Sequence, residues 1–78
     1  MPTSENLRSC VSRTLSRVEI LLQDLDELRD RLATEISESR VSKNEARLRV
    51  LQNVSAAVAR AQEALRTLYV QLGLLALE

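Results

Sequence analysis

Two apolar stripes with helical spacing constrain this chain more than any other feature of its sequence. From Leu51 to Leu72, apolar residues recur at alternating intervals of three and four, as in one helix of a coiled coil. The members of this stripe are Leu51, Val54, Val58, Ala61, Leu65, Leu68 and Leu72. A similar stripe in the first half comprises Val11, Leu15, Val18, Leu22, Leu25, Leu28, Leu32 and Ile36. Matching positions, such as Val18 and Leu65, have residue numbers that add to 83, so the sequence predicts an all-α, antiparallel two-helix hairpin that folds back around residues 41–42.

The breaks in the pattern set the expected boundaries of a single domain, residues 1–78. We expect a first helix over about 4–38, a turn at 39–42, a second helix over about 43–72 and a short apolar tail at 73–78. The first 39 residues hold eight acidic and five basic side chains, and the rest hold three and six. This opposite bias favours packing of the two halves against each other, although each exposed ion pair contributes only about 0–1 kcal/mol.

Capping residues mark both predicted helix starts. Thr3 or Ser4 can cap the first helix. Ser42 and Glu45 match the capping box S-x-x-E, with apolar residues on either side that could staple the second start. Gly73 is a candidate end for the second helix, although the apolar tail can also continue it.

Composition narrows the class of function. The 78 residues carry 11 basic and 11 acidic side chains, and this zero net charge argues against a nucleic-acid binder or a binder of anionic membranes. No apolar run approaches the roughly 20 residues that span a bilayer, and the opening MPTSENLRSCV lacks the apolar core of a signal peptide. A single cysteine rules out an internal disulfide, which makes a reducing cytoplasm the expected location.

The sequence offers no catalytic constellation, cofactor motif or metal site. Because the chain has no histidine, a serine or cysteine nucleophile lacks its usual general base. Cys10 is better explained as a small apolar filler near a helix start than as a reactive thiol. The carboxylates of residues 24–38 lack the Glu-x-x-His pattern of metal sites in helical bundles, and a solvated face explains them better. We therefore expect a protein that is not an enzyme.

The outside of the predicted hairpin divides into an apolar and a polar face. Placed at about 100° per residue, one side of both helices is apolar, and this predicted docking surface consists of Cys10, Leu21, Leu28, Val50, Ala57 and Ala64. The opposite, polar side holds Arg8, Ser12, Glu19, Asp26 and Asp30 with Ser55, Gln62 and Arg66. Arg29 points close to the apolar seam and Leu48 towards the polar side, and neither placement has an explanation in the pattern. The alanines would let another helix approach closely.

Two kinds of partner fit such a surface. A second copy of the chain would close a four-helix bundle, and a different protein would make this chain a binding module. The residues alone leave these two alternatives open.

One segment resembles a known family. The stretch AVARAQEALRTLYVQL, residues 57–72, is similar to the second helix of small type III secretion co-chaperones of the YscE/SsaE type, which are helical hairpins of about this length. Their second helix carries alanine-bearing apolar periodicity and ends in a segment that contains aromatic residues, here Leu68-Tyr69. This chain departs from an aromatic-rich ending, because Val70, Gln71 and Leu72 follow.

The resemblance implies a function in a bacterial cytoplasm. Proteins of this type bind a helical-repeat co-chaperone, and the pair keeps the secretion needle subunit soluble and unpolymerised before export. The alternative expectation is a structural coiled-coil subunit that self-associates into a four-helix bundle or scaffolds a larger complex. No catalytic residue is implied in either case.

Overall fold

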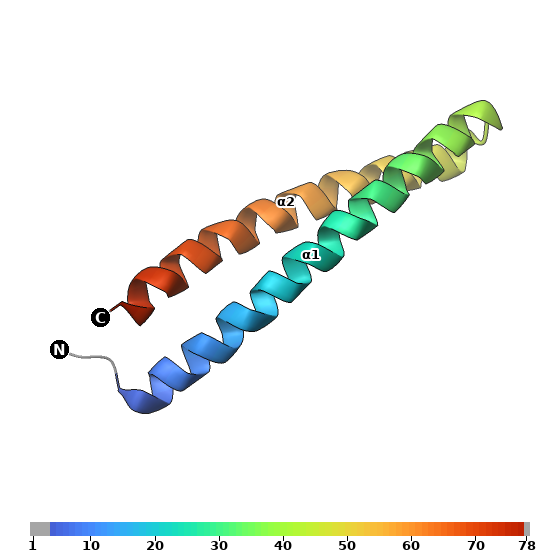
Figure 1. The fold of residues 1–78 in the computed structure, drawn as a ribbon. Coiled ribbons are helices and arrows are strands. Elements are labelled where there is room, and N and C mark those ends of the chain that lie inside the picture. The colour runs from blue at the N-terminus through green and yellow to red at the C-terminus, as the bar shows by residue number, and fades with distance from the viewer. Residues whose placement is uncertain (1–3, 78) are drawn as a thin grey trace.

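Two long antiparallel helices make up the molecule. The computed structural model describes residues 4–77, in which α1 spans Glu5–Val41 and α2 spans Glu45–Ala76. The helices pack along each other and form a rod of 59 × 15 × 14 Å, with the start of α1 and the end of α2 at the same end (Figure 1). The predicted all-α hairpin is therefore confirmed.

The first helix begins at one of the two predicted caps. Ser4 has an extended backbone, and its Oγ accepts a hydrogen bond of 3.2 Å from the Leu7 N–H. Glu5 follows in the first turn, where a negative charge interacts favourably with the unpaired N–H groups of the helix start. The other candidate, Thr3, lies outside the described residues.

The turn between the helices is a Schellman motif that falls later than predicted. The Asn44 N–H donates to the Ser39 carbonyl at 3.0 Å and the Lys43 N–H to the Arg40 carbonyl at 3.2 Å, which is the pattern of that motif. Lys43 has the left-handed φ of 59° that the motif requires. Ser39 is buried at this end of the rod, and its small side chain allows the helices to approach closely there. As a result, α1 continues three residues beyond the predicted end at residue 38.

The second helix is capped by Asn44, so the predicted capping box is wrong. The Asn44 Oδ1 accepts a 3.2 Å hydrogen bond from the Arg47 N–H, whereas the Ser42 hydroxyl donates back to the Ser39 carbonyl and Ser42 ends α1. Asparagine caps a helix as well as serine does, and here it also completes the preceding turn. Val41 is 85% exposed and therefore staples nothing.

The late turn also changes the register of the hairpin. Asp26 contacts Gln62 and Glu19 contacts Tyr69, and the residue numbers of each pair add to 88. The other two contacts, Arg29 with Gln62 and Glu35 with Arg47, involve long arginine side chains and add to 91 and 82. The four contacts centre on about 87, so the predicted sum of 83 is wrong by about the 3.6 residues of one helical turn. Because the chain reverses at residues 42–44 rather than at 41–42, facing residues move to higher numbers, as observed.

The side of α2 that faces α1 is only partly the predicted one. Eight of its buried and half-buried residues, spaced three or four apart, form what we call the inner stripe: Leu48, Leu51, Ser55, Val58, Gln62, Leu65, Tyr69 and Leu72. Three predicted seam residues, Val54, Ala61 and Leu68, are instead exposed. The described apolar residues that are buried, at 3–8% exposure, are Val11, Val18 and Leu32 of α1 with Val58 of α2. The core is therefore a thin line between the helices.

The predicted apolar tail belongs largely to α2. The helix continues through Gly73 to Ala76, so Gly73 does not end it. A side chain at this glycine would meet no atom within 4 Å, and no close approach of another segment requires a glycine there. The last residue of the predicted tail, Glu78, lies outside the described residues.

Candidate docking surface

A buried glutamine forms the most enclosed contact between the helices. The side chain of Gln62 is 0% exposed. Its Nε2 donates to Asp26 Oδ1 at 2.7 Å, and its Oε1 accepts from Arg29 Nη1 at 2.8 Å. Both ends of the amide are therefore satisfied, which offsets the cost of removing the group from water. The contact also accounts for Arg29, whose direction towards the seam had no explanation in the sequence.

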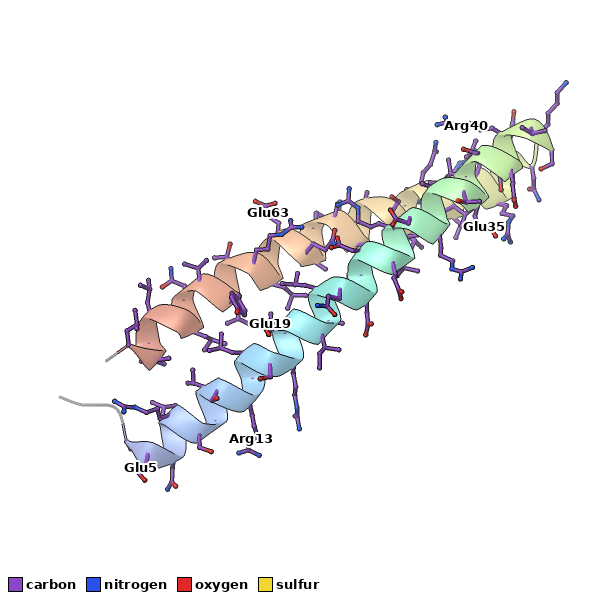
Figure 2. The ribbon with its side chains drawn as sticks, viewed as in Figure 1. Glu5, Arg13, Glu19, Glu35, Arg40 and Glu63 are labelled. Carbon is purple, nitrogen blue, oxygen red and sulfur yellow. The ribbon has the colours of Figure 1, made fainter. Side chains whose placement is uncertain are left out.

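Two further polar contacts join the helices nearer the ends of the rod. The Tyr69 hydroxyl donates to Glu19 Oε1, and Glu19 lies on the side of α1 that faces α2 (Figure 2). This hydrogen bond is the main cause that raises the pKa of Tyr69 above its ordinary value, with burial and the negative charge of Glu19 acting in the same direction. Close to the turn, Arg47 pairs with Glu35 at 3.1 Å.

These contacts correct the predicted polar face. Gln62 was expected to be solvated, but it is fully buried, and Ser55 is half-buried beside it on the inner stripe. Glu19 and Asp26 are exposed, yet both bond across to α2. Leu48, expected to point to the polar side, is half-buried on the inner stripe. α2 is thus rotated so that polar residues share the contact with α1.

The same rotation leaves a second stripe of α2 uncovered. Val54 and Ala61 each come directly before an inner-stripe residue and therefore point about 100° to one side of the contact with α1. Leu21 and Leu28 of α1 likewise come directly before residues of the α1 contact line, by which we mean its buried and half-buried residues together with Arg29, which bonds to Gln62. Because the helices are antiparallel, equal rotations carry both sets to the same side of the rod. We call these exposed residues the apolar face: Leu21, Leu28, Val50, Val54, Ala57, Ala61, Ala64 and Leu68.

The apolar face holds no charged residue along α2, and five of its eight side chains are leucine or valine. Val50 is 61% exposed, and Leu21, Leu28, Val54 and Leu68 are each 40–43% exposed. The alanine side chains at its centre protrude little from the helix, which permits another helix to approach closely. Contiguous apolar surface on a small protein is typical of interaction sites, which makes this face the candidate docking surface.

The total surface of the hairpin is also large for its mass. It amounts to 6094 Å², whereas a compact protein of 8.8 kDa is expected to expose about 4,800 Å². The excess of roughly 1,300 Å² exceeds the approximately 800 Å² that each partner contributes to a standard interface. A partner could therefore cover the apolar face and leave a normally hydrated surface.

All six residues of the predicted docking surface are exposed in the structure. Leu21, Leu28, Val50, Ala57 and Ala64 lie within the apolar face. Cys10 is an exposed free thiol towards the open end of α1, so its expected role as a packing filler is wrong. Sequence reasoning missed Val54, Ala61 and Leu68, because their regular spacing assigned them to the contact between the helices.

The described part of the chain offers little else to a ligand. Residues 4–77 contain no pocket and no group of three or more metal-ligating side chains. Neither helix combines the length and the apolar character needed to cross a bilayer, over the residues described.

Comparison with known proteins returns no relative. The chain matches no protein-family model, no curated protein and no solved structure.

Proposed function

We propose that this chain is a protein-binding co-chaperone of a type III secretion system. It docks through its apolar face on a helical-repeat co-chaperone, and the pair keeps the needle subunit soluble in the bacterial cytoplasm before export. The observation that carries the proposal is the exposure of a continuous, uncharged stripe on α2, flanked by Leu21 and Leu28 of α1.

The position of this stripe connects the geometry to the resemblance. Four members of the apolar face, Ala57, Ala61, Ala64 and Leu68, lie within residues 57–72, the segment that resembles the second helix of the secretion co-chaperones. The regular alanines in that segment are exposed rather than used inside the hairpin. A partner contact supplies a reason for this pattern that the hairpin alone does not.

The mechanism would be the covering of apolar surface. A helical-repeat protein presents a concave, groove-lined surface, and an apolar helix face can lie in such a groove with side chains at helical spacing as anchors. Each protein then shields the other from aggregation. The chain performs no chemistry in this scheme, in keeping with its lack of a catalytic constellation.

Paired arginine substitutions on one helix test the docking surface. Ala57→Arg places a long charged side chain on the apolar face, whereas Ala56→Arg makes the same change at the neighbouring exposed position, which points to the other side. Each variant is co-expressed with a helical-repeat co-chaperone and the needle subunit from the same genome. We expect Ala57→Arg to lose co-purification and Ala56→Arg to retain it, with equal helicity by circular dichroism.

The outcomes separate this function from its alternative. Normal binding by Ala57→Arg would contradict docking through the apolar face. A parent chain that never co-purifies with either protein and forms only a dimer would favour the structural, self-associating subunit. Glu19 and Gln62 were expected on the polar side, but they cannot serve as controls, because both make contacts that join the two helices.

A further inference from the structure

Four charges on α1 border the apolar face in a regular pattern. They lie seven residues apart, alternate in sign and are all exposed: Arg17, Asp24, Arg31 and Glu38. Each directly precedes a residue of the contact line, so all four point to the side of the rod that carries the apolar face. Within residues 4–77, the one ion pair joins Arg47 to Glu35, so these four charges make none inside the hairpin.

This pattern is complementary to itself when two copies of α1 run antiparallel. An alignment centred between residues 27 and 28 sets Asp24 of one copy opposite Arg31 of the other, and Arg17 opposite Glu38. Every such pair joins opposite charges. A parallel alignment in register would instead place each of these side chains opposite the same residue of the other copy, and therefore opposite a like charge. Complementary charges of this kind fix the orientation and register of an interface.

The alanines of α2 form a second pattern, whose centre lies at the same height along the rod as the centre of the charge pattern on α1. Because Asp26 contacts Gln62, the point between residues 27 and 28 on α1 lies level with about residue 60 or 61 on α2. Ala61 is the middle of the three alanines of the apolar face. An antiparallel alignment centred on it sets Val54 opposite Leu68 and brings Ala57 to within one residue of Ala64, so that small residues meet at the centre and larger ones on both sides.

We propose that, in the absence of another protein, the apolar face is covered by a second copy of this chain in an antiparallel dimer. The turn of one hairpin lies beside the open end of the other, and the four helices form a bundle about a two-fold axis. The same surface patch serves on both copies, as a two-fold contact requires. The dimer does not depend on the proposed function, and a heterologous partner of the apolar face would compete with it.

A pair of complementary charge variants tests the arrangement. Each dimer contains two contacts between residue 24 of one copy and residue 31 of the other. In a dimer of Asp24→Arg, both contacts place two positive charges together. In a dimer of Arg31→Asp, both place two negative charges together. We expect each variant alone to dimerise at least roughly tenfold more weakly than the parent. A mixture of the two chains restores opposite charges at both contacts, and we expect a heterodimer of nearly parental affinity. Sedimentation equilibrium measures all four dissociation constants, and circular dichroism reports folding.

Control and repeat variants keep the test decisive. Asp30→Arg makes the same charge change on another side of α1, and its dimerisation should stay within about twofold of the parent. Arg17→Glu mixed with Glu38→Arg repeats the design at the outer pair, in case a central variant unfolds. A parent chain that is monomeric at the highest soluble concentration overturns the proposal, and so does a mixture that associates no better than its separate components. Since no other protein is present, a failure here leaves docking on a helical-repeat partner standing.

Discussion

The inner stripe of α2 and the part of the apolar face on the same helix differ in the size and in the polarity of their side chains. The inner stripe, which packs on α1, includes Ser55, Gln62 and Tyr69. The uncovered stripe next to it carries only valine, alanine and leucine. The inner stripe nevertheless holds the larger apolar side chains, four leucines and one valine against one leucine, two valines and three alanines, so burial of apolar surface also favours it as the contact. The comparison teaches that large apolar side chains and hydrogen bonds together hold the contact between the helices, and that the uniformly apolar, alanine-rich stripe is left available for a partner.

Leucine truncations on α1 give the largest expected difference between the two surfaces. Leu32 is 7% exposed and Leu28 on the apolar face is 40% exposed. We expect Leu32→Ala to lower the free energy of unfolding by about 2–5 kcal/mol and Leu28→Ala by less than about 1 kcal/mol in the monomer. Chemical denaturation at low protein concentration measures both values. Equal losses would show that the two surfaces do not differ in burial.

Gln62 tests whether polar contacts define the inner stripe. Gln62→Ala leaves a cavity and removes the partner of Asp26 and Arg29, so we expect a loss of roughly 1–3 kcal/mol in the free energy of unfolding. Gln62→Leu fills the space with apolar atoms and should stay within about 1 kcal/mol of the parent. Its cost is a less well defined register, because the hydrogen bonds that align the helices are gone.

Thermal and denaturant melts give the stabilities of these variants, and amide hydrogen exchange along α2 reports the register. Gln52→Ala, at an exposed position of the same helix, serves as the control and should change little. If Gln62→Ala proved as harmless as this control, the polar contacts would not distinguish the inner stripe.

The turn sets which stripe faces inwards, and its cap can be measured directly. Asn44→Ala removes the acceptor of the Arg47 N–H, and we expect a loss of about 1 kcal/mol. Ser42→Ala removes a hydroxyl that donates to the Ser39 carbonyl, which also accepts from Asn44, so we expect less than about half of that loss. The sequence alone assigned the larger effect to Ser42. Comparable thermal midpoints for the parent and Asn44→Ala would show that Asn44 does not cap α2, and would favour Ser42 as the cap.

Much of the fold could be predicted from the sequence, because apolar periodicity over more than thirty residues leaves little choice but two long helices. The cap at Ser4 was equally accessible. The rotation and register of α2 were not, since both depend on contacts between residues far apart, such as Asp26 with Gln62. Asn44 was a visible signal for the second cap, but the capping box at Ser42 matched a better-known pattern.

Only part of the candidate site was predicted, because helical spacing alone divided two neighbouring stripes of α2 wrongly. Ala57 and Ala64 were assigned outwards and are exposed, whereas Val54, Ala61 and Leu68 were assigned to the hairpin contact. Helical spacing identifies apolar stripes but gives no rule for choosing between two neighbouring ones. The choice depends on contacts between residues far apart in the sequence, such as those of Gln62 with Asp26 and Arg29, which only the structure brings together.

Tyr69 offers the finest test of the contact, through its pKa. The hydrogen bond to Glu19, with smaller effects of burial and of the Glu19 charge, raises the pKa of Tyr69 above 10.0. Because the pKa is raised in the folded state, the stabilisation is complete below pH 10.0 and is lost as the pH rises through the raised value. Glu19→Gln removes the charge, and we expect the pKa of Tyr69 to fall towards 10.0.

Absorbance of the tyrosinate form measures this pKa without interference, since the chain has one tyrosine and no tryptophan. Glu63→Gln is the matched control, because Glu63 lies on α2 like Tyr69 but points away from α1 (Figure 2), and the titration should not move. If the tyrosine of the parent titrated at its ordinary value, the hydroxyl would face water rather than Glu19. The inner stripe would then end before Tyr69, and the two helices would separate earlier towards the open end of the rod.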